Sequence, residues 1–538
     1  MVYNPYFKVV LFATLSIFTI FLLENNSGKL TLKKTPLKQD VLLIGILIIT
    51  FSIRFLYLRS TENDVDTSTW LSSVIAVNHY PDKLWTLLNY SDSRPLTVLP
   101  LSIAVWAGMP ANYYSAEIVG IFLWIGVIYV LYWTSSIIID KKKSLMLSWS
   151  LALFVSTIWY GYATYNSEHV SVFMISLSMA GCISYQYGKW KNGFISFAIG
   201  LLLGSLIYAK FQNAPMGLVI GFFLFIEMLF NKDWKNGALL IAGSGLPTLL
   251  INVYFAEIGQ LQVFWNNYFW NNFYYSFTNQ FSPMPISERF SLNRTLGFLF
   301  SSYNARIYLM AGFGVFAAGF TLGFPSFLET SAKKKRVVLF AFLLLVASVY
   351  ATLQSGNNFQ HYKLYLFVPL LLCIALTSSV NRIEMQRYLF LVLLGGSLIQ
   401  AGVNIIKLLD MSGPSEFTAL HNKVVKSIEQ HSLQSDPIVV WGWRDALYVD
   451  SKRPMGYRDA HPFHFSLHSP LLPFWTHDFI FDMEKNRPKL FIEAMIPSFS
   501  ERGDLLLSHD EVPAIEHYIR QHYMLIEELE DVKIFKRR

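Results

Sequence analysis

A chain of 538 residues with 53% hydrophobic and only 15% charged residues does not have the composition of a soluble protein, because soluble domains carry nearer a quarter charged residues. The formal net charge of +7 could indicate nucleic-acid binding, but the lysines lie in short clusters between apolar runs, as topology signals do. The composition therefore predicts a multi-spanning membrane protein and argues against nucleic acid as a partner.

Apolar runs of roughly 17–25 residues, long enough to cross a bilayer as a helix, recur along the first three quarters of the chain. They lie near residues 6–23, 41–58, 115–139, 145–164, 170–187, 194–209, 214–230, 237–254, 304–325, 337–353, 364–380 and 388–408. They predict a mainly α, polytopic bundle of about twelve spans, with the first run retained as a span. Cys182 and Cys373 lie inside such runs, which indicates core residues rather than a disulfide or thiol metal site.

Basic clusters follow alternate apolar runs, and the positive-inside rule places them in the cytoplasm. They are Lys29–Lys38, Lys141–Lys143, Lys189 with Lys191, Lys232 with Lys235, Lys333–Arg336 and Arg382 with Arg387. The intervening loops and the polar C-terminal part then face outward, which predicts a multi-pass protein of the cytoplasmic membrane with a periplasmic C-terminal domain. The same parity predicts that the short, proline-containing stretch Pro95–Met109 lies in the interface or re-enters the membrane.

The first outer loop, Arg59–Trp70, contains three carboxylates within five residues, Glu62, Asp64 and Asp66. Such charges must lie in water or in a polar site at the membrane surface. One interpretation is a solvated cap, with Asp64 or Asp66 beginning a helix near Thr67 that runs to about Tyr80. The other is that the carboxylates carry out chemistry at the membrane edge.

Three later outer loops also carry ionisable residues. Glu168 and His169 lie in a short turn between two spans, where a helix-end charge is the simpler interpretation. Lys210 follows a short span and either snorkels to the surface or holds an anion such as a lipid phosphate. The last loop combines an imidazole, a phenol and an ammonium, which suits an anion site better than an aromatic belt; these are His361, Tyr362 and Lys363.

The long outer loop from Glu257 to Arg294 contains an aromatic and amide-rich stretch over residues 262–277. This pattern is typical of a helix in the headgroup layer, and it could also form a platform for a sugar or a lipid tail. Arg289, Arg294 and Arg306 cluster where the chain returns to the membrane.

The predicted domains are a membrane domain at 1–410 and a small α/β domain at 411–538, where the chain becomes polar. Strands are expected near 437–442, 489–492 and 532–535, and helices near 416–430 and 512–522. Four histidines in this part, His461, His464, His468 and His477, match no common ligand spacing, so no metal site is expected.

The order of these features resembles the C-type membrane glycosyltransferases (GT-C), in particular the family 39-like branch with protein O-mannosyltransferases and the lipid A aminoarabinose transferase. The resemblance covers roughly residues 40–410 in layout. The Asp-Glu-x-x-Tyr motif of that family corresponds to Asp66–Trp70 without the Glu, and its Pro-Pro-Leu to Arg94-Pro95-Leu96. The other matching positions are Glu168, Lys210 and Gln360-His361-Tyr362.

The resemblance implies transfer of a sugar from a polyprenyl-phosphate donor to an acceptor hydroxyl with inversion, at the outer face of the membrane. Asp66 is then the expected base, Asp64 being the alternative, and Asp64 or Glu168 would orient the acceptor. The donor phosphate would be bound by cationic and polar groups; the candidates are Lys210, His361, Tyr362, Lys363 and Arg306. Arg94 and His169 are expected to position donor or acceptor.

Neither a cofactor nor a metal is expected, since the lipid-linked sugar is a substrate and phosphate departure needs no metal in principle. The partners are the donor lipid, surrounding membrane lipids and an acceptor that is a lipid, a glycan or a protein. A lipid-linked polysaccharide polymerase or ligase, and a transporter, are the alternative functions; the gathering of ionisable groups at the outer ends of spans argues against a transporter.

Overall fold

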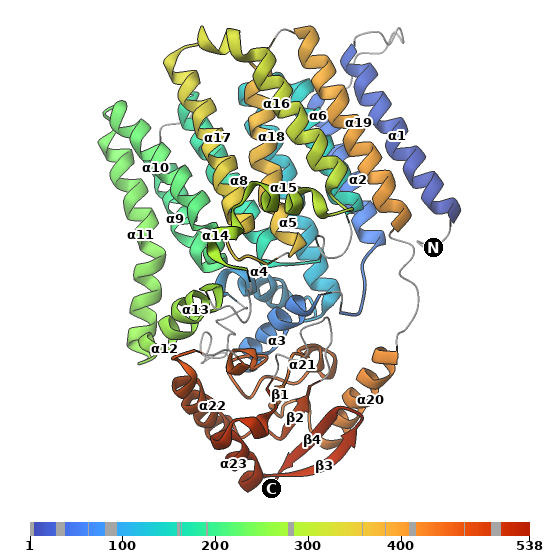
Figure 1. Ribbon diagram of the computed structural model, residues 1–538, viewed down its shortest axis with the longest axis vertical. Helices are drawn as coiled ribbons and strands as arrows, with labels where there is room; N and C mark the ends of the chain where they lie inside the picture. Colours follow the sequence, from blue (N-terminus) through green and yellow to red (C-terminus); the bar gives the residue numbers. More distant parts are fainter. Residues whose placement is uncertain are drawn as a thin grey trace.

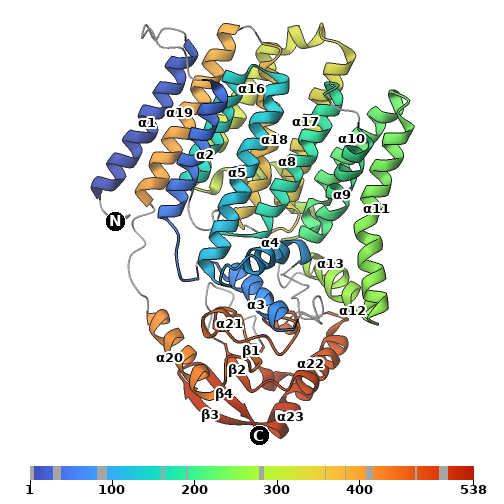
Figure 2. The ribbon, with the colours of Figure 1, turned by 180° about the vertical axis from the view of Figure 1, so that it is seen from behind.

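The computed structural model describes residues 5–27, 38–62, 64–80, 94–158, 162, 164–189, 192–277, 284–357, 359–381, 383–407, 416–466, 469–495 and 507–538. A bundle of long helices fills the upper part of Figure 1, and a small sheet with its helices fills the lower part. Short helices lie between the two, and we call this side the loop end of the bundle (Figure 2).

Every predicted apolar run forms a helix. The helices are α1 (Pro5–Ser27), α2 (Gln39–Leu56), α5 (Tyr113–Ile138), α6 (Lys141–Thr157), α8 (Ser167–Gln186), α9 (Gly193–Ala209), α10 (Ala214–Phe230), α11 (Trp234–Glu257), α16 (Arg306–Leu328), α17 (Ala332–Leu353), α18 (Leu364–Ser378) and α19 (Ile383–Lys407). Within the described ranges, 8 helices are long and apolar enough to cross a membrane, and three shorter apolar helices accompany them. The multi-spanning helical class is confirmed, while twelve spans stays a prediction.

Close packing of α9 against α11 fixes one side of the site described below. A Cβ atom at Gly200 would overlap the backbone of Leu240, and one at Gly243 would overlap the backbone of Phe197. Small residues at such contacts let membrane helices approach closely. Because α9 ends at Ala209 with Lys210 as its C-cap, this packing helps to fix the position of that lysine.

The short elements of the loop end are α3 (Val65–His79), α4 (Pro95–Trp106), η2 (Phe211–Asn213), α12 (Leu261–Trp265), the π-helix η3 (Asn266–Trp270), α13 (Asn271–Phe277), α14 (Ile286–Arg289), α15 (Leu292–Ser301) and η4 (Gln360–Lys363). Of these, α3 and α4 are the helices expected in the first outer loop. Helix α3 begins two residues before Thr67, because Asp64 is the N-cap and accepts the Asp66 N–H. With twelve residues, α4 is too short to span a bilayer.

The C-terminal segment contains a mixed four-stranded sheet in the order β1-β2-β4-β3. Its elements are α20 (Glu416–His431), β1 (Ile438–Trp441), α21 (Ala446–Ser451), η5 (Phe463–Ser466), α22 (Leu472–Asn486), β2 (Leu490–Ala494), η7 (His509–Glu511), α23 (Pro513–His522), β3 (Tyr523–Leu529) and β4 (Val532–Arg537). Strands β1 and β2 pair in parallel, and the other pairs are antiparallel. The three expected strands and two expected helices are confirmed. The domain boundary near 410 lies outside the described residues and stays a prediction.

Helix α3 connects the bundle to the C-terminal segment. Trp70 and Leu71 belong to the main core of the bundle, whereas Ala76 packs into the core of the C-terminal sheet, with Tyr80 against it. The acidic first turn of α3 is therefore fixed between two packed bodies.

Candidate functional site

Consecutive hydroxyls in the first turn of α3 anchor the acidic loop. The Thr67 hydroxyl donates to the Tyr165 carbonyl at 3.0 Å, in the turn that precedes Glu168. The Ser68 hydroxyl donates to Glu62 Oε1 at 2.5 Å and lies 3.0 Å from the Tyr113 hydroxyl of α5. These contacts hold the turn that carries the predicted base against two different parts of the bundle.

The third hydroxyl, on Thr69, donates to the Asp445 carboxylate of the C-terminal segment. Asp445 is fully buried, and its Oδ2 also accepts from His461 Nδ1 at 2.8 Å. Burial lowers the pKa of the neighbouring Arg444 to about 10, and the nearby Glu62 carboxylate opposes that shift. Residues from the end of the chain thus complete the surroundings of the acidic loop.

The acidic loop brings its half-buried carboxylates together. Asp64 Oδ1 accepts the Asp66 N–H at 3.1 Å. Burial raises the pKa of Asp64 well above its usual range, and the carboxylate of Asp66 raises it further. Burial also raises the pKa of Glu62, although the Ser68 hydrogen bond opposes the shift. Asp64 therefore keeps its proton to higher pH than an ordinary aspartate does.

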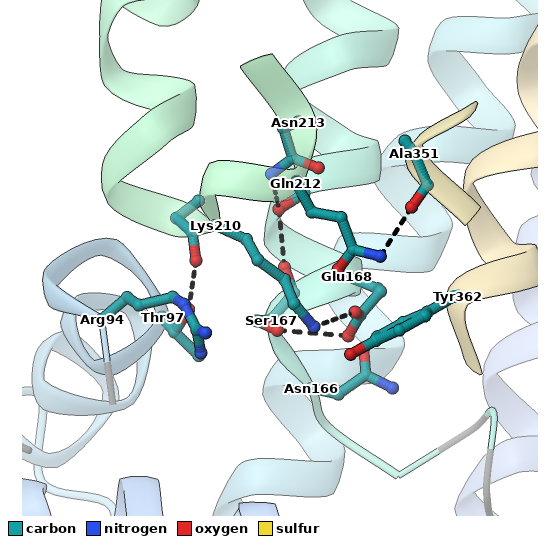
Figure 3. A network of polar contacts seen from close by, with 12 residues as sticks. Arg94, Thr97, Asn166, Ser167, Glu168, Lys210, Gln212, Asn213, Ala351 and Tyr362 are labelled. Atoms are coloured by element: carbon teal, nitrogen blue, oxygen red, sulfur yellow. Dashed lines mark hydrogen bonds and ion pairs between the residues drawn. The ribbon is translucent and has the colours of Figure 1, made fainter. Parts of the chain in front are cut away.

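Lys210 and Glu168 form a buried ion pair at the loop end (Figure 3). Lys210 caps the C-terminus of α9 and is 8% exposed, whereas Glu168 lies in the first turn of α8 and is 1% exposed. The Lys210 ammonium also lies over the Tyr362 ring, 4.5 Å from its centroid. The lysine is therefore held by a carboxylate and an aromatic face, where burial strengthens electrostatic interactions.

A chain of hydrogen bonds connects the acidic loop to this ion pair. Tyr165, whose carbonyl binds Thr67, donates its own hydroxyl to the Thr97 carbonyl of α4 at 2.6 Å. The Thr97 hydroxyl donates to the Ala209 carbonyl, directly before Lys210, at 3.2 Å. Asp66 lies close enough to Lys210 for an electrostatic interaction. The acidic and basic halves of the predicted site are thus parts of one constellation.

Arg94 and His361 belong to the same constellation. Arg94 interacts electrostatically with Lys210 and donates to Asn272 Oδ1 of α13 at 3.3 Å, and Figure 3 shows it on the α4 side of the lysine. His361 interacts electrostatically with both Glu168 and Lys210. Through its contact with Arg94, Asn272 of the amide-rich loop lies at the edge of the site.

Lys363 and Arg306 lie in a second group. Lys363 Nζ donates to Gln360 Oε1 at 2.5 Å and to Ser301 Oγ at 3.3 Å. Arg306 donates through Nη2 to the Ser301 carbonyl at 3.2 Å. The predicted phosphate ligands thus lie in two groups, one around Lys210 and the other around Ser301.

His169 is engaged with the bundle. Its Nε2 donates to the Tyr162 carbonyl at 3.0 Å, and its ring packs edge-on against Trp124. Its Nδ1 faces Gly120 and makes no hydrogen bond with any residue that the structure describes. This placement is typical of a histidine that supports the helix carrying Glu168.

Two features of the site were missed by the sequence analysis. Arg54 of α2 and Glu117 of α5 form a buried ion pair at 3.6 Å; charged residues within apolar runs were the signal that could have found them. Asp445 and Arg444 lie in a segment that carries no motif, so only the fold could place them next to Glu62.

The histidines of the C-terminal segment mostly have protein partners. His461 binds Asp445, and His464 Nε2 lies 3.1 Å from the Tyr457 hydroxyl. His477 is largely exposed, and His468 lies outside the described residues. Within those residues, no group of three or more His, Cys, Asp or Glu is arranged to hold a metal ion. Metal independence stays a prediction.

The helical bundle with its short loop-end helices and its C-terminal α/β segment is the fold of the C-type membrane glycosyltransferases. The chain is similar to ArnT of Cupriavidus metallidurans, a lipid A aminoarabinose transferase, in its structure bound to undecaprenyl phosphate. The TM-score is 0.55 at 11% identity, covering 92% of this chain and 97% of that one.

The apo structure of the same ArnT gives a TM-score of 0.52, with 11% identity and coverage of 92% and 97%. An oligosaccharyltransferase of Archaeoglobus fulgidus, tethered with an acceptor peptide, gives 0.49 at 14% identity, covering 90% of this chain and 72% of that one. No family model and no curated protein matches the sequence. The resemblance expected from the sequence is confirmed for the fold.

Proposed function

We propose that this protein is a membrane glycosyltransferase that moves a sugar from a polyprenyl-phosphate donor to an acceptor hydroxyl. The observation that carries the proposal is the constellation of Asp64, Asp66, Glu168 and Lys210, gathered from the ends of three helices at the loop end of the bundle. The fold is shared with ArnT, whose structure holds undecaprenyl phosphate. The proposed location is the cytoplasmic membrane, with the site and the C-terminal segment on the periplasmic side.

In the proposed reaction, Asp66 takes the proton of the acceptor hydroxyl while its oxygen attacks the anomeric carbon. The new carbon–oxygen bond forms as the bond to the phosphate oxygen breaks, and the electron pair leaves with polyprenyl phosphate. Attack opposite the leaving group inverts the anomeric centre. Asp64 supports this role because its Oδ1 accepts the Asp66 N–H at 3.1 Å and so fixes the turn that carries the base.

The leaving phosphate gains negative charge in the transition state, and fixed cations that face it lower the barrier. We assign this role to Lys210, with His361 and Tyr362 beside it, because these groups lie in one cluster with Glu168. Glu168 is the positioning residue of Lys210, since it holds the ammonium in one place.

Arg94 interacts with Lys210 and also donates to Asn272 of the amide-rich loop, so this loop is a candidate for selecting the acceptor. The acceptor class is a hydroxyl on a lipid, a glycan or a protein. No cofactor is required in this proposal.

The test is release of polyprenyl phosphate from a panel of polyprenyl-phosphate sugars by the purified protein, with membrane extract as acceptor. Wild-type protein should release polyprenyl phosphate from at least one donor, and Lys210→Met should reduce that release strongly. The exposed Lys141→Met on the opposite end of the bundle is the matched control and should behave as wild type. Failure with every donor would contradict the proposal and favour a polymerase, a ligase or a transporter.

A further inference from the structure

The buried ammonium of Lys363 has only neutral partners. Lys363 is 0% exposed, and its Nζ donates to Gln360 Oε1 at 2.5 Å and to Ser301 Oγ at 3.3 Å. Within the described chain, it forms no ion pair with a carboxylate. A buried charge is normally compensated by an opposite charge, because neutral oxygens replace only part of its hydration.

Two further cations lie around the same point. Arg306 donates to the Ser301 carbonyl at 3.2 Å and to the Phe300 carbonyl at 2.6 Å, so Ser301 binds both Arg306 and Lys363. The Phe298 ring lies 4.6 Å from the Lys363 ammonium and 5.4 Å from the Arg294 guanidinium.

The Arg294 contacts also leave capacity for a ligand. Its Nη2 donates to the Gly356 carbonyl at 3.2 Å, and its buried Nε has no hydrogen-bond partner in the part of the chain that the structure describes. None of the three cations pairs with a carboxylate of the described residues. The positive charges of Lys363 and Arg306 repel each other, and an anion between them would remove that repulsion.

Helix α15, which contributes Arg294 and the Phe298 ring to this group, presents apolar residues to its surroundings. On α15, Leu292 is 70% exposed and Leu296 is 47% exposed. A short helix with a cation on one side and exposed leucines on the other is suited to the membrane interface. A ligand that meets both surfaces has an anionic head and an apolar chain.

We propose that Lys363, Arg306 and Arg294 form a second phosphate site that binds the headgroup of a membrane lipid, separate from the Lys210 site. The two sites lie on different sides of η4, because successive residues of a 3₁₀ turn point about a third of a turn apart. Tyr362 therefore faces Lys210, whereas Lys363 faces α15. Lys210 already has Glu168 as its counter-charge, and Lys363 has none among the described residues. The second site does not depend on the transferase reaction.

The test counts lipids bound to the purified full-length protein in a nonionic detergent by native mass spectrometry. The probes are polyprenyl monophosphate, the uncharged polyprenol and inorganic phosphate. Wild type should bind two molecules of polyprenyl monophosphate, and Lys363→Met and Arg306→Gln should each weaken one of them at least tenfold. Arg306 is exposed, so Arg306→Gln keeps the test valid if the buried substitution prevents folding.

The matched control is Lys335→Met, whose lysine binds the Leu328 carbonyl away from this group. It should leave both binding events unchanged, and Lys210→Met should weaken only the other event. Unchanged binding in both Lys363→Met and Arg306→Gln would overturn the proposal. Equal binding of polyprenol would also overturn it, as would competition by inorganic phosphate at the affinity of the lipid. If the wild-type protein shows no sugar transfer but still binds lipid in a Lys363-dependent way, only the proposed transferase function is contradicted.

Discussion

The Lys210 ammonium is paired with the Glu168 carboxylate, and both groups are buried where α9 and α8 meet the loop end of the bundle. Replacing either residue by a neutral one leaves a buried charge of one sign. The pair thus makes both the stability of the loop end and the position of the lysine depend on a single contact.

Glu168→Gln should lower the free energy of unfolding by about 3–5 kcal/mol, the usual effect of removing one partner from a buried pair. The double variant Lys210→Met/Glu168→Gln should regain much of that loss, because no unpaired charge remains, but it should not regain sugar transfer. Thermal unfolding in detergent and the donor-release assay measure the two effects. Equal destabilisation by the single and double variants would show that the pair is not coupled.

Thr69→Val should weaken the attachment of α3 to the C-terminal segment, since it removes the hydroxyl that donates to Asp445. Leaving a buried acceptor with one donor fewer costs about 1–3 kcal/mol. Thr69→Ser keeps the hydroxyl and is the control. Hydrogen exchange of residues 65–79 should be faster in the valine variant alone, and identical protection in both variants would refute the attachment.

Asp64→Asn should change how stability depends on pH. The folded protein raises the pKa of Asp64 above its usual 3.8, so the folded state binds this proton more tightly than the unfolded state. The resulting stabilisation is fully present below the usual pKa and is lost as pH rises through the raised value. Asparagine caps the helix as well but does not titrate, so the Tm of Asp64→Asn relative to wild type should increase from pH 4 upward.

The control for that comparison is Asp531→Asn, at an exposed position of the C-terminal segment. Its Tm should follow wild type across the same pH range. Parallel curves for Asp64→Asn and wild type would show that the folded structure does not stabilise the protonated form of Asp64.

Tyr165→Phe should disturb both halves of the site at once, because the Tyr165 hydroxyl is the donor to the Thr97 carbonyl of α4. Loss of this bond removes one donor from a buried carbonyl and should cost about 1 kcal/mol. We expect reduced turnover together with weaker donor binding, since Thr97 supports the segment before Lys210. Normal turnover in a destabilised Tyr165→Phe would limit this contact to stability.

Local signals predicted much of the fold. The length of the apolar runs predicted the long helices, and the choice of Asp64 or Asp66 as N-cap predicted the start of α3 to within two residues. Strand β3 was not predicted, because its sequence YMLIEEL lacks regular alternation of apolar and polar residues. In the fold, most of its residues are exposed or half-buried. Helix α22 was missed because its histidines and aromatics suggested a loop.

The residues of the site were mostly predicted, but their partners were not. The Thr69–Asp445 contact joins positions 376 residues apart, and the Lys210–Glu168 pair joins positions 42 apart. Patterns along the chain report neighbours on a helix or strand, whereas these pairs depend on how helices pack in three dimensions. For the same reason the sequence grouped Lys363 with Lys210, although they face different elements.

The most direct test of the proposed function is the rate of sugar transfer by Asp66→Asn, measured with the donor that wild type uses and with folding verified. The account predicts a fall of about 10²–10⁴-fold, the usual contribution of a general base, with binding of polyprenyl monophosphate retained. Full transfer activity in a folded Asp66→Asn would contradict the assignment of this carboxylate as the base.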